Sequence, residues 1–477
     1  MASDRQGLPM TASVAGATHY DDAVASLLEF RFDLSDAVQQ AIEVDPAQPM
    51  ARVFSAYLRL LSTEPAEVED GRREFASWQD VSDVSRFTDR ERAHVAIASV
   101  WLDGDLLGAG RLLRTLSAEY PRDILALAVG HQIDFFSGDA TTLRDRIGSA
   151  LPAWSPSDPS YSYLLGMYAF GLEESGDYGQ SEALGRQAVE ISATDVWGIH
   201  AVVHTYEMSA RVDEGLRFLD ERVEEFDGGN FFRVHNWWHY CLFALEAGRP
   251  DLALSVFDAV LRPPDSAPAA MELLDATALL WRLLLEGEVH EDRFALLSGD
   301  WLPFMELPYY AFNDVHAVMA HVGAGRLDAA EALIVERTHY LELAEPGHSN
   351  AMFTSEVGLP VCRALLSFGR GRYDEVLTHL LPIRQQLHTF GGSHAQRDVI
   401  ERTLLEAALR SGSHQVARHL IDERIERRPA SPYAWHKLAS LELAQGNADG
   451  AALDRARAES FTDDTASFGA VSRLVAC

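Results

Sequence analysis

A short turn centred on glycine recurs along this 477-residue chain, and its spacing constrains the fold more than any other sequence feature. Gly104 and Gly138 are 34 residues apart, and Gly138 and Gly176 are 38 residues apart. Similar turns surround Gly248 and Gly446. A repeat of this length, holding two helices and a tight turn, is typical of tetratricopeptide-like solenoids.

The residues inside each repeat agree with a pair of packed helices. Ala96 precedes the turn at Gly104, Ala109 follows it, and Pro121 closes the unit. From Asp21 onward apolar residues recur at helical spacing, and clear period-2 strand patterns are missing. We therefore predict an all-α, tetratricopeptide-like α-solenoid (an α-α superhelix) that is strongly curved and contains about two dozen helices.

The regular spacing also predicts how the chain divides. We expect a flexible N-terminus over 1–20, one continuous helical-repeat domain over 21–461 and a C-terminal tail over 462–477. Two proline-rich stretches, 151–161 and 298–310, interrupt the period. Both contain aromatic residues, so we interpret them as ordered loops, and the second as a candidate lid over the groove.

Charge and cysteine content restrict the partners. Asp and Glu number 72 against 40 Lys and Arg, for a net charge of −32, which repels phosphate backbones and anionic lipid headgroups. We expect neither nucleic acid nor membrane as a partner. Three scattered cysteines form no disulfide framework, and the N-terminus has no apolar signal region. The expected location is therefore cytoplasmic.

Two His-x-x-x-His pairs stand in segments with helical patterns. His200 and His204 form the first pair, and His235 and His239 form the second. Residues four apart lie on one face of a helix, so each pair directs both imidazoles the same way, and Glu207 extends the first row. A polar helix and a glycine turn separate the two segments, which allows the first and third helices to lie side by side.

One polar residue in the first helix of each successive repeat forms a series whose spacing follows the repeat length. First helices line the concave side of such a superhelix, so we expect these side chains to converge. Buried histidines and carboxylates are costly unless they are paired or bind a ligand, which indicates a small-molecule pocket. The series is His94, His131, Tyr168, His204, His239, Asp275, His316, Glu356 and Arg397.

Several stretches, among them HAVVHTYEM, HNWWHY, FNDVHAVMA, LLPIRQQL and GGSHAQRDV, closely resemble the tetratricopeptide repeat protein 38 family. The resemblance runs collinearly from about residue 33 to about residue 426 and implies a soluble, intracellular helical solenoid with no established reaction. The stretch SEVGLP departs from the family pattern, which usually has an aspartate after an arginine. The family motifs place in register His94, His131, His200, His204, Glu207, His235, Asn236, His239, Asn313, Asp314, His316, Arg397 and Asp398.

Three kinds of function remain open. The four paired histidines suit a divalent metal such as zinc, iron or manganese, although Ala201 occupies the glutamate position of an H-E-x-x-H motif and disfavours zincin-type proteolysis. A metal-free acid–base site is the second possibility. The third is a non-catalytic scaffold that binds a peptide or protein partner in its concave groove.

We favour an enzyme acting on a small polar substrate, with its reaction class open. The predicted catalytic residues are His204, Glu207, His239 and His316, and the predicted metal ligands are His200, His204, His235 and His239. The predicted substrate-binding residues are His94, His131, Tyr168, Asn236, Asn313, Asp314, Glu356, Arg397 and Asp398. The simpler alternative is that the single histidines are satisfied core residues and that the aspartates cap helices or pair with arginines.

Overall fold

The computed structural model describes residues 2–461 together with residues 468, 469 and 471. Within these residues the chain forms helices α1 to α26 and one two-stranded antiparallel hairpin, β1 (Ala2–Ser3) with β2 (Pro9–Met10). The all-α prediction and the tetratricopeptide-type solenoid are confirmed. No helix in this described part combines the length and apolarity needed to cross a bilayer.

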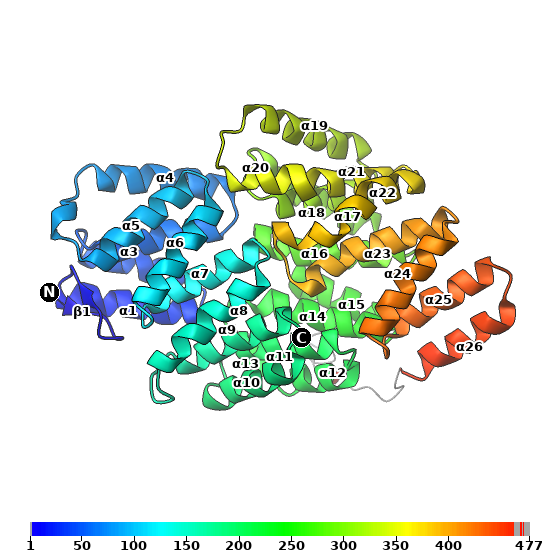
Figure 1. The fold of residues 1–477 in the computed structure, drawn as a ribbon, viewed down its shortest axis with the longest axis horizontal. Helices are drawn as coiled ribbons and strands as arrows, with labels where there is room; N and C mark the ends of the chain where they lie inside the picture. The colour runs from blue at the N-terminus through cyan, green and yellow to red at the C-terminus, as the bar shows by residue number, and fades with distance from the viewer. Residues whose placement is uncertain (1, 462–467, 470, 472–477) are drawn as a thin grey trace.

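The N-terminal third is a stack of helical hairpins (Figure 1, blue to cyan). A Gly-Asp pair explains two of its tight turns, at 104–105 and 138–139. Gly104 and Gly138 adopt positive φ, and the next residues, Asp105 and Asp139, cap the second helix by accepting a backbone N–H three residues on. The elements are α1 Val14–Leu28, α2 Leu34–Val44, α3 Pro49–Leu61, α4 Pro65–Gln79, η1 Val84–Arg86, α5 Asp89–Leu102, α6 Leu106–Glu119, α7 Ile124–Phe136, α8 Ala140–Ala150 and η2 Leu151–Ala153.

The middle of the chain carries both histidine pairs. The two helices that carry these pairs, α11 and α14, pack against each other, as the helix–turn–helix–turn–helix layout predicts. The intervening polar segment is divided into two helices. The elements are α9 Tyr161–Glu174, α10 Tyr178–Ile191, α11 Val196–Met208, α12 Val212–Asp220, α13 Val223–Phe226, α14 Arg233–Glu246, α15 Pro250–Val256 and η3 Phe257–Leu261.

The C-terminal part continues the stack (Figure 1, green to red) and contains a π-helical turn, η5, and a long 3₁₀ segment, η6. The elements are α16 Ala270–Leu285, α17 Glu291–Asp300, η4 Leu302–Met305, α18 Ala311–Gly323, α19 Leu327–Leu343, α20 Ser349–Phe353, η5 Thr354–Gly358, α21 Leu359–Gly369, α22 Tyr373–Leu380, η6 Leu381–Phe390, α23 His394–Arg410, α24 His414–Arg427, α25 Pro432–Ala444 and α26 Ala448–Glu459.

The first helices of the repeats form an inner layer. Successive members α9, α11, α14, α16 and α18 contact one another in order. All thirteen residues of α18 are buried, as are the first twelve residues of α11. A helix that is apolar nearly all round belongs inside a fold, whereas the second helices keep an exposed face. Polar residues on the inner helices are therefore enclosed by protein.

The superhelix is curved tightly enough for distant repeats to touch. The Tyr309 hydroxyl donates a hydrogen bond to the Leu60 carbonyl at 2.9 Å, and the Asn313 amide donates to the Thr63 carbonyl at 3.1 Å. These partners are about 250 residues apart in the sequence. The contacts join α18 and the segment before it to the end of α3.

Within the segment 1–20, for which the sequence predicts flexibility, the described residues form a hairpin and the start of α1. Residues 2–10 form the hairpin, and α1 begins at Val14. The Asp4 carboxylate pairs with the buried Arg90 guanidinium at 2.7 Å, and the Thr11 hydroxyl donates to Glu91 at 2.7 Å. A buried arginine needs such a partner, which anchors the hairpin on α5. Most of the predicted tail at 462–477 lies outside the described residues.

Candidate functional site

Four imidazoles meet between α11 and α14. His200 and His204 lie one turn apart on α11, and His235 and His239 lie one turn apart on α14. Each ring offers one nitrogen that lies within 4.8 Å of the corresponding nitrogens of the other three. The ring centroids of His204 and His239 are 4.4 Å apart, and those of His200 and His235 are 4.9 Å apart. We call these four residues the histidine cluster.

Two of the imidazoles are held from behind by carboxylates. The Nδ1 of His235 lies 2.7 Å from Asp275 Oδ2, and the Nδ1 of His239 lies 2.8 Å from Glu207 Oε2. When Nδ1–H donates a hydrogen bond to a carboxylate, the tautomer of the ring is fixed and Nε2 carries the lone electron pair. This is the arrangement that metal-ligating histidines usually have in proteins.

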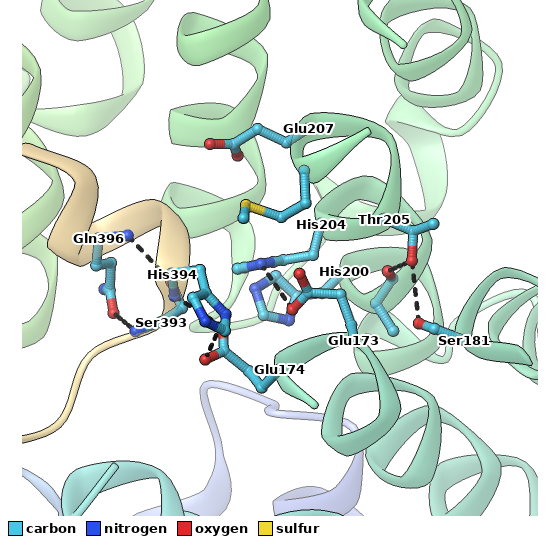
Figure 2. Close-up of polar contacts among 12 residues, drawn as sticks. Glu173, Glu174, Ser181, His200, His204, Thr205, Glu207, Ser393, His394 and Gln396 are labelled. Atoms are coloured by element: carbon cyan, nitrogen blue, oxygen red, sulfur yellow. Dashed lines mark hydrogen bonds and ion pairs between the residues drawn. The ribbon is translucent and has the colours of Figure 1, made fainter. Parts of the chain in front are cut away.

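A third carboxylate lies behind His204. The Glu173 Oε2 atom is 3.4 Å from His204 Nδ1, and both side chains are fully buried. Figure 2 shows the His204 ring directed at the Glu173 carboxylate. Burial, and then the neighbouring Glu174, raise the pKa of Glu173 well above its usual value. Three of the four imidazoles thus have a carboxyl group beside Nδ1.

The inner nitrogens of the cluster lack ordinary partners. His204 Nε2 and His239 Nε2 are buried without a hydrogen bond among the described residues, and His200 Nε2 faces His235 Nε2 at 3.1 Å. A buried polar atom without a partner costs free energy. Aromatic rings, including Phe170 at 4.9 Å from the His200 ring, surround the cluster. The Nε2 atoms of His204 and His239 are therefore left without a protein partner among the described residues, beside the hydrogen-bonded pair of His200 and His235.

Three imidazoles of the cluster, those of His200, His204 and His239, are neutral at physiological pH. Burial lowers the pKa of His204 to about 4, and burial followed by the neighbouring imidazoles lowers the pKa of His200 well below its usual value. The pKa of His239 is lowered in the same way. Only the neutral imidazole has an electron pair to offer, so these nitrogens are in the form that binds a metal ion.

A second polar group adjoins the first. Glu174 Oε2 lies 3.1 Å from His394 Nδ1 (Figure 2). The same oxygen lies 3.3 Å from Arg397 Nη2, and Glu174 Oε1 accepts the His394 backbone N–H at 2.8 Å. Burial opposes ionisation of Glu174, but the charges of His394 and Arg397 outweigh it and hold the pKa of Glu174 below its usual value. Glu174 therefore serves as the anionic partner of α23.

A cavity of about 380 Å³ adjoins the histidine cluster. His200 and His235 line it, whereas His204 and His239 lie behind them and do not. The His235 side chain is 16% exposed and is the most open of the four. Cavities of this size hold small molecules, and polar groups at one end of an apolar cavity fix the orientation of a ligand.

Four predicted binding residues and the predicted catalytic residue His316 have protein partners and do not line the cavity. His94 lies 2.9 Å from Asp123 and 3.1 Å from the Tyr57 hydroxyl, so it is a satisfied core histidine. The others bind as follows: His131 to the Met167 carbonyl, His316 to the Phe312 carbonyl, Asn313 to Thr63 and Asp314 to Arg337.

The remaining predicted residues divide three ways. Asn236 is fully buried, and neither amide atom has a partner among the described residues. Arg397 binds Glu174 and the Gly392 carbonyl, and Asp398 pairs with Arg402 and Arg424. Tyr168 lies against Gly148 of α8, and Glu356 is exposed in η5. The structure thus places Tyr168 and Glu356 away from the cluster.

The 298–310 segment, the candidate lid, does not cover the 380 Å³ cavity. The Tyr309 hydroxyl binds the Leu60 carbonyl and Tyr310 approaches the Phe136 carbonyl at 3.4 Å, so the segment bridges to α3 and α7. None of its residues lines the 380 Å³ cavity. Its aromatic side chains are used for packing between repeats.

Sequence reasoning missed the roles of several residues. Glu174 and His394 come from α9 and α23 and meet through 220 residues of intervening chain. Phe30 and Phe232 touch at 4.7 Å between ring centroids and form part of the cavity wall. Phe232 lies three residues before His235 and offered a signal, but no local pattern connects Phe30 to the site.

No family model matches this chain. Among solved structures the chain is similar to a monomeric mutant of IFIT1 with Gppp-AAAA, at 13% identity and a TM-score of 0.39, covering 93% of this chain and 100% of that one. It is also similar to the APC/C hetero-tetramer Cut9-Hcn1, at 12% identity and a TM-score of 0.29, covering 97% and 95%. The assignment of the fold rests on the helices described above.

Proposed function

We propose that the histidine cluster binds one divalent transition-metal ion and that the chain is an enzyme acting on a small molecule in the adjoining cavity. The observation that carries this proposal is that the Nε2 atoms of His204 and His239 are buried without a partner among the described residues, while carboxyl groups lie beside Nδ1 of three of the four rings. Asp275 and Glu207 hold His235 and His239 by Nδ1, which directs the Nε2 electron pairs inward. Packing alone does not require this orientation.

The ligand set favours particular metals. Four imidazoles with no carboxylate in direct range of all of them suit zinc or iron better than manganese, which prefers oxygen ligands. Of the predicted catalytic residues, His204 and His239 act as ligands in this proposal, and Glu207 orients His239. His316 has no part in it, because its Nδ1 is bound to the Phe312 carbonyl and it does not line the cavity.

The motif resemblance supports placing the chain in the tetratricopeptide repeat protein 38 family, in the cytoplasm, and leaves the reaction open. A bound metal ion adjoining the cavity would supply a Lewis acid beside the bound substrate. The chain's own residues would hold the ion, orient the imidazoles and exclude water from the apolar wall. A domain over 21–461 would then enclose the site as a single unit.

The second candidate is a scaffold for a peptide or protein partner. The helical-repeat architecture favours it, because concave surfaces of such solenoids hold extended chains. The contacts of Tyr309 with Leu60 and of Asn313 with Thr63 weigh against it, because they close the superhelix over the space that a long peptide would need.

Metal analysis separates these possibilities. Protein purified without chelators should contain roughly one equivalent of zinc or iron per chain by mass spectrometry. The double variant His204→Gln/His239→Gln should contain less than about a tenth of an equivalent. His316→Gln removes a buried histidine outside the cluster and should keep the metal. Metal below a tenth of an equivalent in wild-type protein, with no uptake on dialysis against zinc or ferrous salts, would overturn the proposal.

A further inference from the structure

The cavity beside the histidine cluster has an aromatic wall that leads from its rim to the imidazoles. The ring centroids of Phe30 and Phe232 are 4.7 Å apart, and those of Phe232 and Trp197 are 5.0 Å apart. Phe232 and Phe170 each lie 4.9 Å from the His200 ring. All of these residues line the cavity. A flat or extended apolar body therefore finds a continuous surface that ends at the cluster.

The charges around the cavity have a single sign. Glu64, Glu272 and Asp275 line it, and no Lys or Arg is among its lining residues in the part of the chain that the structure describes. Asp275 is 2% exposed, and its Oδ1 atom is buried without a hydrogen-bond partner among those residues. An unpaired carboxylate oxygen in an apolar cavity is costly, and a cationic ligand would relieve that cost.

The carboxyl groups of Glu64, Glu272 and Asp275 all lie on or beside α16. Glu272 lies one turn before Asp275 on α16. Glu64 reaches the start of the same helix, where its Oε1 accepts the Ala270 backbone N–H at 3.1 Å. Burial, and then the charge of Asp275, raise the pKa of Glu272.

The nearest guanidiniums belong to other carboxylates. Arg233 pairs with Asp227 at 2.6 Å, and Arg262 pairs with Asp300 at 2.6 Å. Both also act on Glu272 through space and do not line the cavity. The acidic rim is therefore open to a cation supplied by a ligand.

From this geometry we infer that the cavity binds a hydrophobic amine beside His200 and His235, with its ammonium group among Glu64, Glu272 and Asp275 and its apolar body along the aromatic wall. The inference rests on the proposed function and specifies its substrate class, because the same two histidines form the floor of the cavity. It replaces the expectation of a small polar substrate. Carboxylates and phosphates are disfavoured, because every charged group on the lining is acidic. Aromatic faces also attract ammonium groups.

A matched set of ligands tests the inference. We suggest 4-phenylbutylamine, 4-phenylbutanol and 4-phenylbutyrate, which share one apolar body and differ in charge, with binding measured by calorimetry on the full chain. The amine should bind at least about tenfold tighter than the carboxylate, with the alcohol between them, because one such ion pair is worth about that factor. n-Butylamine, which has the charge without the ring, controls for attraction to the acidic surface and should not bind in the same range.

Two variants locate the binding. Glu272→Gln keeps the shape of the side chain and should lower the affinity for the amine about tenfold while leaving that for the alcohol unchanged. Phe232→Ala should weaken binding of both. Equal or tighter binding of the carboxylate, no binding of any phenyl ligand, or an amine affinity that Glu272→Gln leaves unchanged would overturn the inference.

The metal and ligand proposals fail separately. The same titrations on the His204→Gln/His239→Gln variant measure amine binding without the metal ligands, and both of those residues lie outside the cavity lining. If wild-type protein holds no metal but still prefers the amine, the ligand inference stands and the metal proposal falls. If metal is bound but the amine is not preferred, only the ligand inference falls.

Discussion

The carboxylate of Asp275 lies 2.7 Å from Nδ1 of His235, on the side of the ring opposite the histidine cluster. The Nε2 atom of the same ring faces the Nε2 of His200 at 3.1 Å. The hydrogen bond to Asp275 thus favours the tautomer of His235 with the proton on Nδ1, in which Nε2 accepts from His200. It also joins the cavity lining to the cluster, because Asp275 and His235 both line the cavity.

Replacing Asp275 with Asn should weaken metal binding without abolishing it. The amide is close in shape but does not hold the Nδ1–H as a carboxylate does, so His235 loses both basicity and orientation. We expect the metal affinity to fall about 10–100-fold, measured by competition with a chromophoric chelator. Glu272→Gln, one turn earlier on α16, is the matched control and should leave the affinity within about twofold. An Asp275→Asn protein with wild-type affinity would show that this carboxylate does not support a metal ligand.

The part of the site made of helical pairs was predictable from the sequence. Histidines four apart share a helix face, so the directions of His200 and His204 follow from spacing alone, as do those of His235 and His239. The repeat length then brings α11 and α14 together. The placement of Glu207 beside His239 follows from the same geometry, because Glu207 is one turn beyond His204.

The series of one polar residue per repeat was predictable only in part. The position of these residues relative to each turn glycine varies by two or three residues. Each step of one residue along a helix turns the direction of the side chain by about 100°. Tyr168 consequently lies against α8, while Glu173 of the same helix is directed at His204. Glu356 falls in the π-helical turn η5, whose wider spacing changes the phase again. Such offsets depend on packing between repeats, which no local pattern reports.

Asp314 should prove structural, although it was predicted to bind substrate. Its Oδ1 accepts from Nε of Arg337 at 2.9 Å, and the Arg337 side chain is only 2% exposed. Asp314→Ala removes the partner of a buried charge and should destabilise the fold by about 3 kcal/mol in urea unfolding, with metal content unchanged. Glu336→Ala removes the exposed partner of the same arginine and should cost less than about 1 kcal/mol. A normal urea midpoint for Asp314→Ala, or a loss of metal, would contradict this interpretation.

Gly138 should tolerate substitution less well than Gly176, although both occupy the same position in their repeats. Both have positive φ, which costs a residue with a side chain about 1 kcal/mol. A Cβ atom at Gly138 would also lie 1.7 Å from the carbonyl oxygen of His388, whereas one at Gly176 would meet nothing within 4 Å. We expect Gly138→Ala to cost more than about 3 kcal/mol and Gly176→Ala about 1 kcal/mol in urea unfolding. Equal losses would mean that η6 does not pack on this turn.

Asp195 should make the protein less stable as pH rises. It caps α11 by accepting the Gly198 N–H at 2.9 Å, and burial raises its pKa to about 7 from a usual 3.8. Between these two pKa values the folded chain keeps a proton that the unfolded chain has released. The free energy of unfolding therefore falls with increasing pH across that window, and the contribution of the Asp195 proton is fully lost above about pH 7. Asn keeps the cap and cannot ionise.

The gain in unfolding free energy from Asp195→Asn should therefore be about 1–2 kcal/mol larger at pH 8 than at pH 5.5. Urea unfolding followed by circular dichroism at the two pH values measures it, and both values avoid precipitation near the pI of 4.8. Asp195→Ala separates the two effects, because it removes the charge and the cap together and should show the same pH dependence from a lower baseline. A difference between Asp195→Asn and wild type that stays constant with pH, or that shrinks as pH rises, would show that the carboxyl group is already ionised in the folded chain.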